Sequence, residues 1–259
     1  MAGITGKTPS ATYKDLLQMD NGNSGVDDTL RPIKEGFGDS SALYIEKNSV
    51  KVKPASDDAA LLDVHDKDGT SLLKVDSSND RVYALGNKVN TQYAYFGTNS
   101  TDTVPTSNNT HWAIPFGLGA FAQNDVSLGT GTDPATTLAV STIADDVVPM
   151  MWFIPDDITI DGVYAWLAGN STDGDGLRLH LMTYNIVLTD GTSCGDLSSG
   201  VVVADGGNIS HDGYEQMDFQ SMTIQNADVA RQNVCLFTLY SDGTNSDYAL
   251  NITVKYHLR

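Results

Sequence analysis

The sequence between residues 41 and 85 repeats a short apolar frame at an interval too small to enclose a core. Two copies, Leu61-Leu62-x-Val64-x-Asp66 and Leu72-Leu73-x-Val75-x-Ser77, lie 11 residues apart. Each copy predicts a strand of about five residues that ends in a polar turn. A segment of fewer than about 50 such residues buries too little apolar surface to be stable alone. Because short strand repeats need neighbours to complete a core, we expect the neighbours to be other copies of the chain.

Residues 41–90 are therefore expected to form a β-repeat shaft that is completed by other copies of the chain. A looser copy of the frame, Ala42-Leu43-x-Ile45, precedes the other two. The apolar side chains expected to meet in the interface between copies are Leu43, Ile45, Leu62, Val64, Leu73 and Val75.

The distribution of charge indicates a boundary near the end of this segment. Residues 1–90 carry 11 basic and 14 acidic side chains, whereas residues 91–259 carry 4 basic and 19 acidic ones. A shift of this size places a domain boundary near residues 86–90. The net charge of −18 also argues against nucleic-acid binding, which depends on basic side chains that displace counterions from phosphate.

Residues 91–259 have the pattern of an antiparallel β protein. Apolar and polar residues alternate from Tyr248 to Leu258, which predicts a strand with one buried face and one solvated face that includes His257. Turn sequences such as STDGDG and TDGTSCGD separate other short apolar runs. We expect a mostly β chain in which residues 91–144 form a β-rich connecting region and residues 145–259 an antiparallel β-sandwich head, jelly-roll-like in type. Strands are expected at about 92–96, 112–122, 136–142, 147–154, 158–167, 177–188, 200–204, 216–224, 234–240 and 248–258.

Residues 1–40 show little apolar periodicity and are expected to attach the protein to a partner. Thr12 and Asp15 match an acidic variant of the capping box, which predicts a short helix from Tyr13 to Met19. A helix of this length does not persist alone in water, so it needs a surface on which to dock. The side chains expected to make that contact are Tyr13, Leu16, Leu17 and Met19.

The sequence also bears on the compartment. It shows no signal-peptide pattern at its start and no apolar run long enough to span a bilayer, so we expect synthesis in a cytoplasm without membrane insertion. In a reducing compartment, Cys194 and Cys235 are not expected to form a structural disulfide.

Patterns that could support catalysis or metal binding are weak. The segment GTSCG matches a nucleophile elbow around Ser193, but no helix-forming sequence follows it, so a turn is expected. The five histidines lack the helical spacing of a zinc site, and each is expected to be solvated or to serve packing. Acidic loops at 66–69 and 171–176 leave calcium binding open, although each lacks a required ligand position. We assign no catalytic residue, no metal site and no cofactor.

The N-terminal third resembles a known group of proteins. Residues 12–54 resemble the N-terminal part of fibre-like virion proteins of tailed bacteriophages, especially marine ones. The matching elements, spread over about residues 10–85, are Thr12–Gln18 (T-Y-K-D-L-L-Q), the turn at Asn23–Asp27, Lys34–Leu43 with Gly36, Gly38 and Ser41, and Leu73–Asp76 of the L-x-V-D type. The C-terminal part, from residue 147 onward, is similar in composition to the β-sandwich heads of phage fibres and decoration proteins.

This resemblance implies a homotrimer that is fixed by its N-terminus to other proteins of a phage virion, with a β-rich shaft and a distal sandwich head. The protein would be made in the host cytoplasm and act on the particle. Our leading hypothesis is a non-enzymatic structural virion protein, a short fibre or decoration protein on the capsid.

Two alternatives stay open. One is a tail fibre or receptor-binding protein whose head contacts a host surface glycan. Trp112, Trp152 and Trp166 lie in apolar runs and are expected in the core, but an exposed tyrosine or tryptophan could stack on a sugar ring. The other is a glycan-active β-sandwich enzyme, which would need carboxylates that meet in a cleft.

Overall fold

The computed structural model describes residues 17–19, 21–22, 24–35, 38–98, 104–105, 109–120, 126–169, 175–211, 216–242 and 247–259. The chain divides into two compact units, residues 1–89 and 90–259. The boundary between the units, after residue 89, coincides with the boundary expected near residues 86–90 from the change in charge composition. Among the described residues, no helix is long and apolar enough to cross a membrane.

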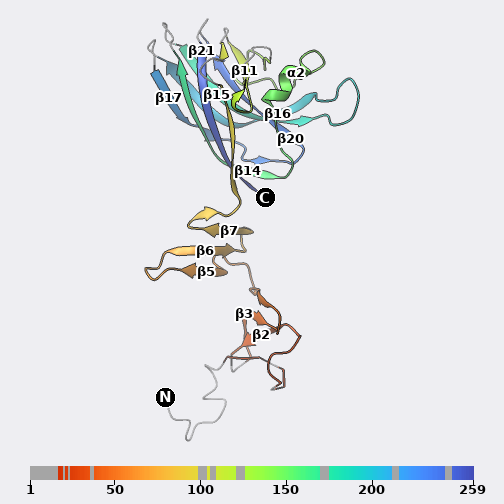
Figure 1. The fold of residues 1–259 in the computed structure, drawn as a ribbon, viewed down its shortest axis with the longest axis vertical. Coiled ribbons are helices and arrows are strands. Elements are labelled where there is room, and N and C mark those ends of the chain that lie inside the picture. The colour runs from red at the N-terminus through yellow and green to blue at the C-terminus, as the bar shows by residue number, and fades with distance from the viewer. Residues whose placement is uncertain are drawn as a thin grey trace. The chain divides into compact units, whose positions relative to one another are not determined.

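The first unit contains two antiparallel sheets whose strands follow one another in chain order (Figure 1). One sheet consists of β1 (Gln18–Met19), β2 (Arg31–Lys34), β3 (Ser40–Ile45) and β4 (Val50–Val52). The other consists of β5 (Leu62–His65), β6 (Ser71–Asp76), β7 (Arg81–Ala84) and β8 (Asn87–Lys88). The repeated sequence frame therefore lies on β3, β5 and β6.

The turn between β5 and β6 shows what the acidic loop at residues 66–69 does. The Asp66 carboxylate accepts hydrogen bonds from the backbone N–H groups of Asp68 at 2.9 Å and Thr70 at 2.8 Å. Gly69 has φ of +86°, a conformation that side chains with a Cβ rarely adopt. The carboxylate thus stabilises the hairpin turn itself, which is the common role of aspartate in such positions.

The second unit is built from longer strands and very little helix. Its elements are β9 (Thr91–Thr98), β10 (Val104–Pro105), β11 (Thr110–Ile114), β12 (Gly117–Ala120), α2 (Ala144–Val147), the 3₁₀ turn η1 (Val148–Met150), β13 (Trp152–Phe153), β14 (Ile158–Gly169), β15 (Asp175–Ile186), β16 (Leu197–His211), β17 (Gln216–Ser221), β18 (Thr223–Ile224), β19 (Asp228–Val229), β20 (Asn233–Ser241) and β21 (Asp247–Leu258). The expectation of a mostly β chain with an antiparallel sandwich is confirmed.

Eight of these strands pair in a nested order. β9 pairs with β21, β11 with β20, β14 with β17 and β15 with β16, so the first strand of the set meets the last and the second meets the seventh. β21 also pairs with β14, and β20 with β15, which joins the pairs into sheets ordered β9-β21-β14-β17 and β11-β20-β15-β16 (Figure 1). This is the strand order of a jelly roll, in which one long antiparallel hairpin is rolled into two sheets.

The second unit has two apolar cores because both faces of one sheet are covered. The larger core lies between the two sheets and includes Phe96, Phe237 and Ile252. The smaller core lies on the outer face of the β11-β20-β15-β16 sheet, where residues 126–151 pack over side chains such as Met182. Leu181 faces the first core and Met182 the second, as the two-residue period of a strand requires.

The boundary expected at residue 144 is not seen. β9 and β11, from the expected connecting region 91–144, are the first two strands of the jelly roll. The whole of residues 90–259 is one compact unit. Sequence patterning could not show this, because the partners of β9 and β11 are the last two strands of the chain.

One expected strand is absent from the described structure and another is much shorter than expected. Residues 136–142 contribute one isolated bridge, Leu138 to Leu197. Within residues 147–154 only Trp152–Phe153 is a strand, β13, and it follows the end of α2 and the 3₁₀ turn η1. Pro149 lies inside η1 and lacks the N–H group that a continuous strand would need. Val147 and Met150 of this segment pack in the second core, whereas Trp152 and Ile154 pack in the first.

The alternation in the last strand is confirmed at its centre and wrong near its end. Leu250, Ile252 and Val254 are all buried in the core between the sheets, as expected. His257 is also buried, although the pattern placed it on the solvated face. A register shift in β14 between Ile160 and Gly162 places Asp161 beside it, with 2.8 Å between Asp161 Oδ2 and His257 Nδ1.

Candidate functional site

In the second sheet of the first unit, strands β5, β6 and β7 share a face of apolar side chains, which is bordered by Asn87 of β8 opposite Ala84. Leu62 on β5 lies opposite Val75 on β6, which lies opposite Val82 on β7. Directly opposed residues of antiparallel strands point to the same side of the sheet. In the next row of the sheet, Leu73 lies opposite both Val64 and Ala84. Six side chains therefore form one surface, called here the apolar repeat face: Leu62, Val64, Leu73, Val75, Val82 and Ala84.

The apolar repeat face is largely open to solvent in a single chain. Leu62, Val64, Leu73 and Val82 are between 38% and 43% exposed. Covering the remaining surface of a side chain of this size stabilises an assembly by about 1–2 kcal/mol. A contiguous row of such side chains is typical of an interface and atypical of a solvated surface.

The opposite face of the same sheet is more polar, although it also carries Leu72, which lies two residues before Lys74 on β6 and is 40% exposed. Asp63, Lys74 and Tyr83 lie opposite one another there, and Lys74 Nζ is 4.8 Å from the centre of the Tyr83 ring. The Ser71 hydroxyl donates a hydrogen bond to Asp63, which lowers the pKa of that carboxyl. The sheet is therefore amphipathic, with one face suited to water and the other to a partner.

The remaining residues expected in the shaft lie on the other sheet of the first unit. Leu43 on β3 is opposite Val52 on β4, and Ile45 is opposite Val50. Leu43 and Val50 are exposed, while Ile45 is half-buried. The six expected shaft residues are thus divided between two sheets, and on each sheet they share a face with other apolar residues.

The two expected attachment residues that the structure describes, Leu17 and Met19, are not helical. Gln18 and Met19 form β1, and Met19 lies opposite Ile33 on β2. Leu17 directly precedes β1 and is exposed, whereas Tyr13 and Leu16 lie outside the described residues. The helix prediction is wrong at its C-terminal end because backbone pairing with β2 replaces the hydrogen bonds of a helical turn, a contact that local patterning does not reveal.

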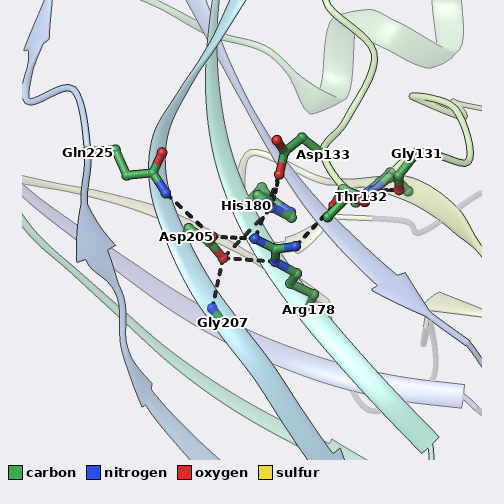
Figure 2. A network of polar contacts seen from close by, with 9 residues as sticks. Gly131, Thr132, Asp133, Arg178, His180, Asp205, Gly207 and Gln225 are labelled. Carbon is green, nitrogen blue, oxygen red and sulfur yellow. Dashed lines mark hydrogen bonds and ion pairs between the residues drawn. The ribbon is translucent and has the colours of Figure 1, made fainter.

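A polar network on the second unit was not expected from the sequence. Arg178 on β15 donates two hydrogen bonds to Asp205 on β16, Nε to Oδ1 at 3.0 Å and Nη2 to Oδ2 at 2.5 Å (Figure 2). Its Nη1 donates to the carbonyl oxygen of Thr132 at 3.3 Å. Asp205 also accepts a hydrogen bond from the backbone N–H of Gly207 at 2.8 Å. Figure 2 shows the Arg178 guanidinium between Asp205 and the segment at Gly131–Asp133, so it joins that segment to the sheet.

Two fully buried histidines adjoin this network. The ring centroids of His111 and His180 are 5.2 Å apart, and His180 Nε2 is 3.4 Å from Asp133 Oδ1. Burial lowers the pKa of His180 from 6.5 to about 4 and also lowers the pKa of His111. Both rings are therefore neutral at pH 7, and the arrangement serves packing.

The other buried histidines are held by carboxylates or carbonyl groups. His211 Nδ1 is 2.9 Å from Asp218 Oδ2, and its Nε2 is 3.2 Å from the carbonyl oxygen of Gly169. His211 is the last residue of β16. Its contacts anchor the end of β16 to the neighbouring sheet.

The remaining chemical motifs do not gather into a site. Ser193 lies in a turn, as expected, and that turn leads into β16 without a helix. In the part of the chain that the structure describes, no three His, Cys, Asp or Glu side chains are placed to hold a metal ion. Most of the acidic loop at 171–176 lies outside the described residues.

Comparison with protein-family models, with curated proteins and with solved structures finds no match for this chain.

Proposed function

We propose that this protein is a structural component of a tailed-bacteriophage virion, a short trimeric fibre or decoration protein attached to the capsid through its N-terminal segment. The apolar repeat face is the observation that carries this proposal. It lies on an amphipathic sheet of short strands that leaves its apolar side open in a single chain. Three copies that share this face would complete a core that one copy lacks.

The second unit supports the role of a distal head. Its jelly roll encloses a core between two sheets and a further core on one of them, so it needs no partner to bury most of its apolar residues. Its composition of 19 acidic and 4 basic side chains keeps such a head soluble. The resemblance of residues 10–85 to fibre-like virion proteins supplies the phage context.

The mass of the full chain in solution tests the proposal. Sedimentation equilibrium at micromolar concentration is expected to give three times the 27.7 kDa of one chain. The mass of a single chain would contradict it. Labelling of intact particles with an antibody against residues 90–259 would then distinguish a capsid location from a tail location.

A further inference from the structure

The outer face of the β9-β21-β14-β17 sheet carries a continuous group of exposed aromatic side chains. Trp166 on β14 lies opposite Phe219 on β17, and one row along, Tyr95 and Tyr164 flank Thr253 of β21. We call this surface the aromatic outer face, and its six large apolar side chains are Tyr93, Tyr95, Tyr164, Trp166, Met217 and Phe219. They are between 40% and 67% exposed.

This face lacks the negative charge found elsewhere on the unit. Its aromatic residues are interspersed with Ser221, Asn251, Thr253 and Lys255, none of which is a carboxylate. The unit as a whole carries 19 acidic and 4 basic side chains. Aromatic residues and methionine are enriched in the centre of protein–protein interfaces and carboxylates are depleted there, which is the composition of this face.

The area of the face also matches an interface. Six half-exposed side chains of this size offer on the order of 600 Å². The largest apolar patch on a typical monomer reaches about 300–600 Å², and each partner in a stable complex contributes about 800 Å². With the polar residues between them, the six side chains supply most of one side of such an interface.

We propose that the aromatic outer face is buried against a neighbouring copy of the chain, so that the heads as well as the shafts are in contact in the trimer. This inference rests on the trimer proposed above. A carbohydrate partner is less suitable, because the rings of Trp166 and Phe219 pack against each other and do not offer one flat surface to a sugar ring. Their centroids are 4.9 Å apart and their planes are tilted by 47°. In a threefold assembly the contact is heterologous, so this face meets a different surface of the next copy.

Acrylamide quenching of Trp166 fluorescence in the full chain tests the inference. The Trp166 signal is the difference between the natural protein and a Trp166→Phe variant. In the trimer we expect Trp166 to be quenched several-fold less than in the urea-unfolded chain. Tyr95→Glu adds a negative charge to the face of an already acidic unit, and we expect it to raise Trp166 quenching several-fold. Because β21 separates Tyr95 on β9 from Trp166 on β14, this substitution does not itself uncover Trp166.

The matched control is Leu188→Glu, which adds the same charge at an exposed apolar residue outside the face and should leave quenching unchanged. A threefold mass with Trp166 freely quenched would overturn the inference and leave the proposed trimer intact. Protection of Trp166 only after addition of host polysaccharide would make the occupant a carbohydrate and would also overturn it. If the full chain has the mass of a single copy in solution, both the proposed trimer and this contact are wrong.

Discussion

Arg178 and Asp205 form a bidentate ion pair between adjacent strands, and the arginine also donates to the Thr132 carbonyl. The pair is mostly buried, with 20% of the Arg178 side chain and 13% of the Asp205 side chain exposed. The hydrogen bonds from Arg178 lower the pKa of the Asp205 carboxyl. One pair therefore joins β15, β16 and the segment that covers the second core.

Removal of Arg178 should destabilise the second unit. Arg178→Met leaves a largely buried carboxylate without its cation, and we expect the free energy of unfolding to fall by about 2–4 kcal/mol. Urea denaturation followed by circular dichroism measures this change. Arg178→Lys keeps the positive charge but not the bidentate hydrogen bonding, so its free energy of unfolding should fall by less than that of Arg178→Met. Equal stability of Arg178→Met and the natural protein would show that the pair is dispensable.

The buried histidines should make the protein sensitive to acid. The pKa of His180 is lowered from 6.5 to about 4. Between these values the unfolded chain binds a proton that the folded chain does not, so stability decreases as pH falls below 6.5 and levels off near pH 4. The loss from His180 is at most roughly 3 kcal/mol.

Urea midpoints measured from pH 7.5 to pH 4.5 check this dependence. His111, Arg178, Asp133 and Asp205 surround His180, and Asp205 titrates below its ordinary pKa, outside this range. His180→Gln should flatten the pH dependence, whatever its effect at pH 7.5. An unchanged slope in that variant would assign the acid sensitivity to another group.

A charge on the apolar repeat face should dissociate the proposed trimer. Val64→Asp places a carboxylate where three copies are expected to pack, and we expect the mass in solution to fall to that of one chain. Lys74→Asp introduces the same residue on the opposite, polar face and should leave the mass unchanged. If both variants retain the mass of the natural protein, the apolar repeat face is not the interface.

A charge in the core of the jelly roll should unfold it. Ile252 is fully buried and lies opposite both Phe96 and Ala165. Ile252→Asp should cost at least about 4 kcal/mol, because the carboxylate is desolvated without a partner. Thermal unfolding measures the loss, and Ser198→Asp at an exposed position of β16 is the control. A normal melting temperature for Ile252→Asp would be inconsistent with this core.

Deletion of residues 1–40 should separate assembly from attachment. The deletion removes β1, β2 and the expected attachment residues but leaves β5–β8 and the jelly roll. We expect a soluble protein with the threefold mass that no longer joins virions, because in the proposed trimer residues 1–40 supply the three anchors that act together. Quantitative immunoblotting of purified particles provides the measurement. Full copy number after the deletion would place the attachment site elsewhere.

Local patterning was sufficient for the class of fold and for the strands that it marks most strongly. The alternation from Tyr248 to Leu258 placed Leu250, Ile252 and Val254 in the core, because a strand with one buried face must alternate. The repeated frame marked four of the six side chains of the apolar repeat face for the same reason, but not Val82 and Ala84. Turn composition placed Ser193 and Asp66 in turns.

Tertiary structure alone decided which strands and side chains meet. The first strand of the jelly roll pairs with the last, and Arg178, Asp205 and Thr132 come together from three separate segments. Met19 joins a strand because Ile33 lies beside it, and His257 is buried because a bulge places Asp161 next to it. Local periodicity indicates only whether a side chain tends to be buried. Which residue it packs against depends on turns many residues away in the sequence. The positions of those turns are determined by the packing of the whole unit.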